Sequence, residues 1–307
     1  MSFLNSSALQ SFKTLFISIV LEAIPFILLG VLISSLLHVF VPDKIIRRLV
    51  PRNPILGLLF ACLLGIVFPV CECGMIPVVR RLILKGMPVY MAVVFILTGP
   101  ILNPVIYAAT FMAFRNRPEI AYSRMGLAFA AAFIIGLILY RFVKSNPLRS
   151  NGGSLNHIHA PGGHSHEDHH SGNRMTAFFM HASDEFFEMG KYLVFGCLLT
   201  AGIQAMVARE SLAAIGHGPW SSHLFMMGFA YVLSLCSTSD AFVASSFLST
   251  FTAGSLLTFL VFGPMLDFKS TLMLLSVFKS RFVLLLALLI GVTVLAGSLL
   301  FERLHFI

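Results

Sequence analysis

The sequence predicts an all-α polytopic membrane protein. Of its 307 residues, 57% are hydrophobic and 11% are charged, whereas soluble domains are about 45–50% apolar and about 25% charged. The mean hydropathy is +0.90. A membrane-spanning helix needs about 20 residues, so the apolar sequence is sufficient for about eight to ten transmembrane helices. This composition excludes both a water-soluble enzyme and a disordered chain.

The apolar runs form two groups, one on each side of a single hydrophilic segment. They cover 12–41, 55–70, 87–99, 101–114 and 121–143, and then 186–207, 223–236, 241–262, 264–278 and 282–301. No small-residue cleavage site follows a short apolar core, so we expect an uncleaved first helix rather than a signal peptide. The predicted domains are a first membrane repeat at 1–144, a His-rich linker at 145–174 and a second membrane repeat at 175–307.

Several apolar runs are too short to cross a bilayer as straight helices. They are interrupted at 69–74 (PVCECG), at 86–88 (GMP) and at 99–100 (GP). Irregular backbone at membrane depth occurs only where it is buried in protein or lines a cavity. We therefore expect broken or re-entrant helices at a central site.

An internal repeat relates the two groups of apolar runs. Two homologous halves are typical of secondary transporters, whose solute site lies near the bilayer midplane between the repeats. An odd number of crossings per half would make the repeat inverted, and an even number would make it parallel. The matching positions are Glu22 and Gly30 with Glu188 and Gly196 at an offset of 166, 71–74 with 236–239 at 165, and 99–103 with 263–267 at 164.

Basic residues are concentrated in the first half. Residues 1–150 hold 14 Lys and Arg against four acids, a net charge of +10, while 151–307 hold seven against nine, a net charge of −2. Short cytoplasmic loops of membrane proteins retain Lys and Arg. We interpret the clusters as topological signals and expect no nucleic-acid partner. The clusters are Lys44, Arg47, Arg48 and Arg52, and then Arg115, Arg117 and Arg124.

Thiols and carboxylates at the helix breaks are the candidate binding groups. Cys71-Glu72-Cys73-Gly74 offers two thiols and a carboxylate, which suit a soft cation or a thiophilic metalloid. The alternative is that a free Cys is a small buried hydrophobe, which fits Cys62 and Cys197 better. The predicted substrate-binding residues are Cys71, Glu72, Cys73, Gly74, Asn103, Cys236, Ser237, Thr238, Ser239, Asp240 and Asp267.

Acidic residues inside apolar runs are further candidates. A charge at the centre of a membrane helix costs about 2.5–3.5 kcal/mol on insertion scales, so such residues are often functional. Glu22 and Glu188 are repeat-equivalent and are predicted to couple transport to protons. The alternative for Glu188 is a structural ion pair with Lys191. Asn103 and Asp267 lie beside Gly-Pro breaks, which are either solute sites or plain hinges.

The hydrophilic segment is rich in histidine. Such tracts bind zinc or another divalent ion weakly, with carboxylates assisting, and the alternative is a solvated linker. No other cofactor is predicted. The histidines are His157, His159, His164, His166, His169 and His170, accompanied by Glu167 and Asp168.

Three segments carry a resemblance to a known family: 69–74 (PVCECG), 98–104 (TGPILNP) and 236–242 (CSTSDAF). The chain resembles the predicted permeases of the YraQ/ArsP type over most of its length, apart from the His-rich loop. This resemblance implies a multi-pass protein in the bacterial cytoplasmic membrane. One branch of the family exports trivalent organoarsenicals, and some relatives look like partners of a second membrane protein in zinc-responsive gene groups.

The expected function is therefore that of an integral membrane permease. Its solute would be a small thiophilic metalloid or soft metal species that passes through a pocket between two repeats. Transport of this solute could be coupled to the movement of protons. The alternative is an accessory subunit of a two-component membrane complex linked to zinc or other divalent metal homeostasis. We expect no enzyme, because no nucleophile, base and orienting group occur together in a recognisable motif.

Overall fold

Long apolar helices dominate the structure, as the composition predicts. The computed structural model describes residues 7–51, 53–68, 71–143, 147–149, 174–206, 220–248 and 250–303. Within these ranges the chain is all-α, which confirms the predicted fold class. Four shorter apolar helices, of 10 to 14 residues, accompany the long ones. The five helical segments long and apolar enough to cross a membrane are Gln10–Phe40, Glu119–Phe142, Phe178–Gln204, Ala253–Val277, which is divided into two helices, and Ser280–Arg303.

The first half begins with a long helix and continues through short ones. Its breaks follow local chemistry: Pro54 and Pro104 occupy first helical positions, where no backbone donor is lost. Asn103 caps the second of these helices by accepting a hydrogen bond from the Val105 amide at 2.9 Å. The helices are α1 (Ser7–Phe40), α2 (Asp43–Leu49), α3 (Pro54–Val67), α4 (Glu72–Leu84), α5 (Val89–Thr98), α6 (Pro104–Ala113) and α7 (Glu119–Phe142).

The second half also begins with a long helix and continues through shorter ones. The break expected at Gly263-Pro264 lies slightly later, because Pro264 is inside a helix and Asp267 forms a capping box with Ser270 that starts the next one. Ser234, at φ 44°, ends another helix in the left-handed region. The helices are α8 (Arg174–Met206), α10 (Ser221–Leu233), α11 (Ser239–Ser245), α12 (Ala253–Met265), α13 (Phe268–Val277) and α14 (Ser280–Arg303).

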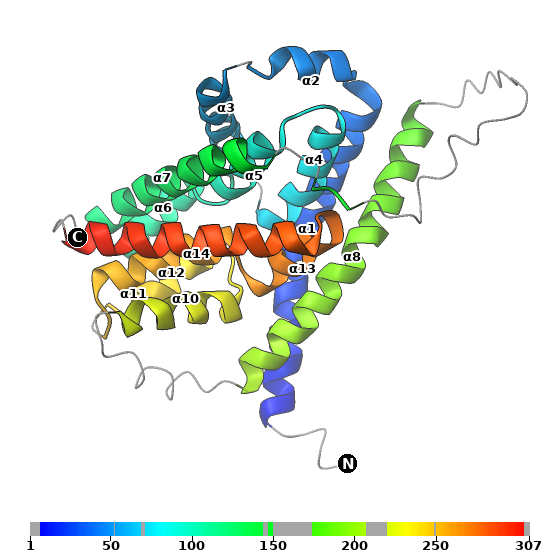
Figure 1. Cartoon of the computed structure of the whole chain (residues 1–307). Helices are drawn as coiled ribbons and strands as arrows, with labels where there is room; N and C mark the ends of the chain where they lie inside the picture. The colour runs from blue at the N-terminus through cyan, green and yellow to red at the C-terminus, as the bar shows by residue number, and fades with distance from the viewer. Residues whose placement is uncertain are drawn as a thin grey trace, which may run out of the picture.

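Two antiparallel helix pairs form the frame (Figure 1). In the pair α1 and α8, the Ser35 hydroxyl donates to the Phe178 carbonyl at 2.6 Å near one end. Near the other end, Gly202 faces the ring of Phe12. The pair α7 and α14 is also antiparallel. The contacts of Gly126 with Phe301 and of Leu127 with Gly297 place the end of α14 beside the first part of α7.

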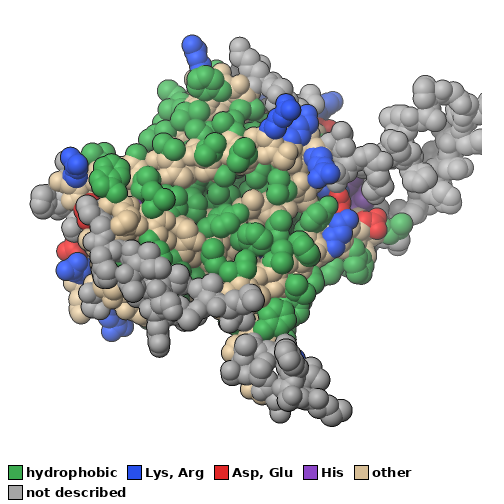
Figure 2. Space-filling model, turned by 60° about the horizontal axis from the view of Figure 1, so that its bottom comes forward, with side chains coloured by type: hydrophobic (Ala, Val, Ile, Leu, Met, Phe, Trp, Pro, Cys, Tyr) green, Lys and Arg blue, Asp and Glu red, His purple; other side chains and the backbone are tan. Residues whose placement is uncertain are grey.

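The surface is apolar over a wide area. Figure 2 shows hydrophobic side chains spread across one face, with Lys and Arg mostly toward its margins. Large hydrophobic side chains such as Leu21, Val67 and Phe142 are exposed. A surface of this kind is suited to lipid rather than water. It agrees with the multi-pass membrane protein that the helix lengths define.

Three arginines of the first half form ion pairs with acids of the second half. The pairs are Arg80 with Glu188 at 3.1 Å, Arg81 with Glu185 at 3.7 Å and Arg124 with Asp240 at 2.9 Å. Our interpretation of Arg124 as a loop signal is therefore wrong. It lies within α7, is fully buried, and has its charge compensated by Asp240.

The start of the predicted linker binds the second half. The Arg149 amide donates to the Val277 carbonyl at 2.8 Å, and the Lys279 amide donates to the Pro147 carbonyl at 3.0 Å. These bonds fix 147–149 to the turn between α13 and α14. The six predicted zinc-binding histidines, from His157 to His170, lie outside the described residues.

Candidate functional site

A small cavity lies where α1, α4 and α13 meet the turn between α10 and α11. Its volume of about 20 Å³ is roughly that needed for one water-sized group. The polar residues around it come from both halves of the chain. The lining residues are Ile19, Glu22, Ala23, Phe26, Cys71, Glu72, Cys73, Cys236 and Lys269. We call the six polar members, Glu22, Cys71, Glu72, Cys73, Cys236 and Lys269, the cavity cluster.

A direct backbone contact brings α1 against the start of α4. A Cβ added to Gly30 would lie only 2.6 Å from the Gly74 Cα. Only glycine at position 30 permits this approach without a shift of the backbone. The Cys71 carbonyl accepts hydrogen bonds from the amides of Gly74 and Met75, both at 3.1 Å, which begins α4 directly after the first thiol.

The other side of the cavity is built by the second half. The Ser234 hydroxyl oxygen accepts a hydrogen bond from the Phe268 amide at 3.1 Å, which joins the end of α10 to the start of α13. This contact brings Cys236 and Lys269 to the same place. A Cβ added to Gly196 of α8 would lie 3.6 Å from the Lys269 Cα. Gly30 of α1 thus packs against the start of α4, and Gly196 of α8 packs against the start of α13.

Two buried carboxylates, Glu72 in the cavity wall and Asp267 at the start of α13, have unused hydrogen-bonding capacity. Glu72 is 4% exposed, and its Oε1 has no hydrogen-bond partner. Asp267 is fully buried, and although Oδ1 caps α13, Oδ2 has no partner. The buried ammonium of Lys269 lies within electrostatic range of both carboxylates. A buried polar atom without a partner is costly, and two such atoms, Glu72 Oε1 and Asp267 Oδ2, belong to this part of the molecule.

The structure brings several of the predicted binding residues together. Cys71, Glu72, Cys73 and Cys236 line the cavity with Glu22, and Gly74 forms the contact with α1. The Thr238 hydroxyl donates to the Cys236 sulfur at 3.6 Å. Sequence reasoning did not select Lys269. The signal that could have found it is a lysine inside the apolar run 264–278.

Other predicted residues lie elsewhere. Asn103 caps α6, Ser239 begins α11, and Ser237 and Asp240 bind Arg124. Glu188 does not line the cavity but pairs with Arg80 at 3.1 Å. The alternative partner of Glu188, Lys191, has its ammonium 5.3 Å from the centroid of the Tyr192 ring.

The thiols border the cavity without forming a chelate. All five cysteines are free. Across the described ranges, no group of three or more His, Cys, Asp or Glu side chains is placed to hold a metal ion. The cavity cluster is therefore a set of soft and charged groups in an open arrangement rather than a closed metal centre.

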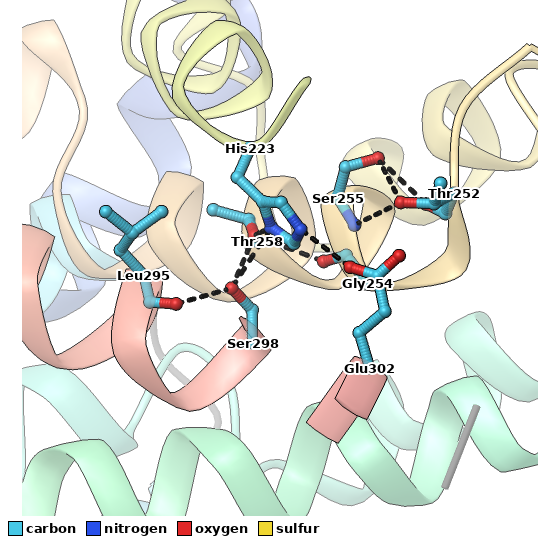
Figure 3. A network of polar contacts seen from close by, with 8 residues as sticks. All are labelled: His223, Thr252, Gly254, Ser255, Thr258, Leu295, Ser298 and Glu302. Carbon is cyan, nitrogen blue, oxygen red and sulfur yellow. Dashed lines mark hydrogen bonds and ion pairs between the residues drawn. The ribbon is translucent and has the colours of Figure 1, made fainter. Parts of the chain in front are cut away.

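A second buried polar network joins α10, α12 and α14 (Figure 3). His223 is fully buried; its Nδ1 lies 2.8 Å from the Thr258 hydroxyl and its Nε2 lies 2.8 Å from a Glu302 carboxylate oxygen. Ser298 lies 3.3 Å from His223 Nδ1 and donates to the Leu295 carbonyl at 3.0 Å. We call His223, Thr258, Ser298 and Glu302 the histidine network. Sequence reasoning missed it, although His223 stands at the start of an apolar run.

Long apolar helices, with shorter broken helices around a small polar cavity, define a polytopic membrane protein. Residues 8–303 match the model of the family ArsP_1, described as "Predicted permease", and the chain belongs to that family. It is similar to "UPF0718 protein YcgR" of Bacillus subtilis (strain 168), with 49% identity over 300 residues, covering 96% of this chain and 98% of the relative.

A second relative comes from Streptococcus mutans serotype c (strain ATCC 700610 / UA159). It is named "Putative two-component membrane permease complex subunit" and is 38% identical over 283 residues, which cover 92% of this chain and 91% of the relative. No solved structure matches the chain.

Proposed function

We propose that the protein is a permease of the bacterial plasma membrane that moves a small thiophilic metalloid or soft metal species. The observation that carries this proposal is the cavity cluster, in which Cys71, Cys73 and Cys236 from two halves meet a buried carboxylate with an unpaired oxygen. Thiols select soft ligands, and the carboxylates and Lys269 provide charge for polar groups on the solute. The open arrangement of the thiols suits a carrier, because a transported solute must also be released.

We also propose that the two halves are inverted repeats. The order of the helices supports this: a long helix opens each half, α1 and α8, and a long helix closes each half, α7 and α14. Phe12 and Phe178 are 166 positions apart, the offset of the sequence repeat, and each lies against the opposite long helix, near Gly202 and Ser35 respectively. A two-fold relation between antiparallel helices is the geometry on which alternating access relies.

Glu22 is the better placed of the two predicted proton-coupling residues. It lines the cavity, where a change in its charge would alter its electrostatic interaction with a bound solute. Glu188 pairs with Arg80 across the two halves, so its contribution would come through the closure of that contact. We propose Glu22 as the coupling group.

Transport in proteoliposomes tests the proposal. Uptake of phenylarsine oxide by vesicles containing purified protein should fall at least about tenfold in Cys71→Ala/Cys73→Ala and in Glu72→Gln, because each removes a group that faces the solute. Cys62→Ala is the matched control, since this buried thiol belongs to α3 and does not line the cavity. Wild-type uptake in both site variants would contradict the proposal.

The same vesicles separate the second candidate function, that of an accessory subunit in a two-component complex linked to divalent metal homeostasis. The name of the Streptococcus mutans relative favours the two-component part of this alternative and specifies no metal. Under that alternative, the purified chain alone would carry no flux, and uptake would appear only when a second membrane protein that co-purifies with it is added. Flux by the chain alone would favour the permease.

A further inference from the structure

We infer that Arg124 is a positioning residue for Cys236: it crosses from the first half and fixes the turn that brings this thiol to the cavity. The inference rests on the proposed function only for the importance of the thiol. The contact itself is defined by hydrogen bonds and burial.

Arg124 uses both ends of its guanidinium group. It is fully buried in α7. Its Nη2 donates to the Asp240 carboxylate oxygens at 2.9 and 3.1 Å and to the Ser237 carbonyl at 3.2 Å. Its Nη1 donates to the Thr110 hydroxyl of α6 at 2.7 Å. The Thr110 hydroxyl donates in turn to the Ile106 carbonyl at 2.7 Å, which fixes the acceptor on its own helix.

These contacts hold both flanks of one short turn. Ser237 directly follows Cys236, and the Cys236 carbonyl accepts a hydrogen bond from the Asp240 amide at 3.0 Å. The helix that follows, α11, has only seven residues. A helix this short is not stable by itself, so the position of the turn depends on its tertiary contacts. Arg124 provides the charged one.

The geometry requires arginine rather than any cation. A planar guanidinium can donate to a carboxylate, a carbonyl and a hydroxyl at once, whereas the ammonium of lysine is a point charge without this fork. Both charges are almost fully removed from solvent, with side-chain exposures of 0% for Arg124 and 4% for Asp240. Loss of the fork would therefore loosen the turn while the charge remained.

The contact also sets the thiols of the two halves relative to each other. Arg124 and Cys71 belong to the first half, and Cys236 belongs to the second. If the halves move during transport, the Arg124 contact carries that movement to the Cys236 turn. Asp240, predicted from sequence as a solute ligand, is in this view the anchor of the turn.

Site-resolved thiol labelling tests the inference without any solute. Cys71 and Cys236 are partly exposed and the other three cysteines are buried. N-ethylmaleimide labelling followed by mass spectrometry therefore gives a rate ratio of Cys236 to Cys71. In Arg124→Lys and in Asp240→Asn, this ratio should rise at least about threefold, since thiol modification depends on access. Arg80→Lys is the matched control. Arg80 also forms an ion pair with the other half of the chain, at Glu188, and its substitution should leave the ratio unchanged.

An unchanged ratio in folded Arg124→Lys would overturn the inference. Where that variant does not fold, Thr110→Val removes the Nη1 acceptor and keeps the ion pair with Asp240; a smaller rise supports the inference, and an unchanged ratio overturns it. Wild-type uptake by the thiol and Glu72 variants, with a raised ratio in Arg124→Lys, would reject the proposed permease site and leave the positioning role intact.

Discussion

The cavity cluster and the histidine network are both polar groups within an apolar protein, and each includes an acid that is not buried, Glu22 and Glu302, but they differ in completeness. In the histidine network both ring nitrogens of His223 have partners at 2.8 Å. In the cavity cluster Glu72 keeps a buried oxygen without a partner. Because an unpaired buried polar group lowers stability, the histidine network is expected to contribute more to stability than the cavity cluster, which agrees with the solute site that we propose for the cluster.

Glycine supports the two groups in different ways. A Cβ on Gly254 would lie 2.6 Å from a Glu302 carboxylate oxygen, so that glycine makes room for a side chain. Gly30 makes room for the backbone of Gly74. A side chain can move aside more easily than a helix backbone, so the cavity cluster depends more strictly on its glycine.

The largest expected effect comes from Gly30→Ala. The new methyl group would force α1 away from the backbone at the start of α4, which should lower the unfolding free energy by about 3 kcal/mol or more. Chemical unfolding in detergent measures the change. Gly190→Ala is the control: no neighbouring atom lies within 4 Å of its added Cβ, so its stability should be unchanged or raised by up to about 1 kcal/mol. Equal destabilisation by both would remove the special role of the Gly30 contact.

An intermediate effect separates the two polar groups directly. His223→Ala should lower the unfolding free energy by about 1–3 kcal/mol, because Thr258 and Glu302 lose a buried partner. Glu72→Gln should change it by less than about 1 kcal/mol, since the unpaired oxygen contributes no hydrogen bond. The same unfolding assay measures both. Equal losses from the two substitutions would show that the cavity cluster is also structural.

The smallest effect is expected for Glu188→Gln, which belongs to neither group. Its partner is Arg80, and the two side chains are 28% and 17% exposed. A partly exposed ion pair contributes about 0.2–1 kcal/mol and is weakened by salt. Unfolding at low and high salt measures this loss. A loss of uptake with unchanged stability would instead support the predicted coupling role of Glu188.

Local sequence was sufficient for much of the fold and for part of the site. The apolar runs predicted most of the helices, but α2 and α4 lie outside every predicted run, and the run 241–262 divides into α11 and α12. The Gly-Pro and Cys-Glu-Cys segments predicted most of the other breaks. Pro264 is an exception, because a proline within the helix is accommodated while the cap at Asp267 decides the boundary.

Tertiary pairing explains what the sequence did not reveal. Arg124 and Asp240 are 116 positions apart, and no local pattern distinguishes an acid that binds solute from one that binds a distant arginine. Lys269 likewise belongs to the cavity only because Ser234 joins α10 to α13. Part of the basic excess of the first half is accounted for in the same way, by arginines that pair across the two halves.

The attachment of 147–149 to the turn after α13 has a mechanical consequence. Helix α13 has ten residues and is therefore about 15 Å long. Lys269 is near its first residue, and the hydrogen bonds of Val277 and Lys279 lie at or just beyond its other end. A movement of the chain at Arg149 is therefore transmitted to α13, a short helix whose other end carries Lys269 of the cavity cluster. The segment that connects the halves is thus coupled mechanically to the site, through α13, as well as being a covalent link.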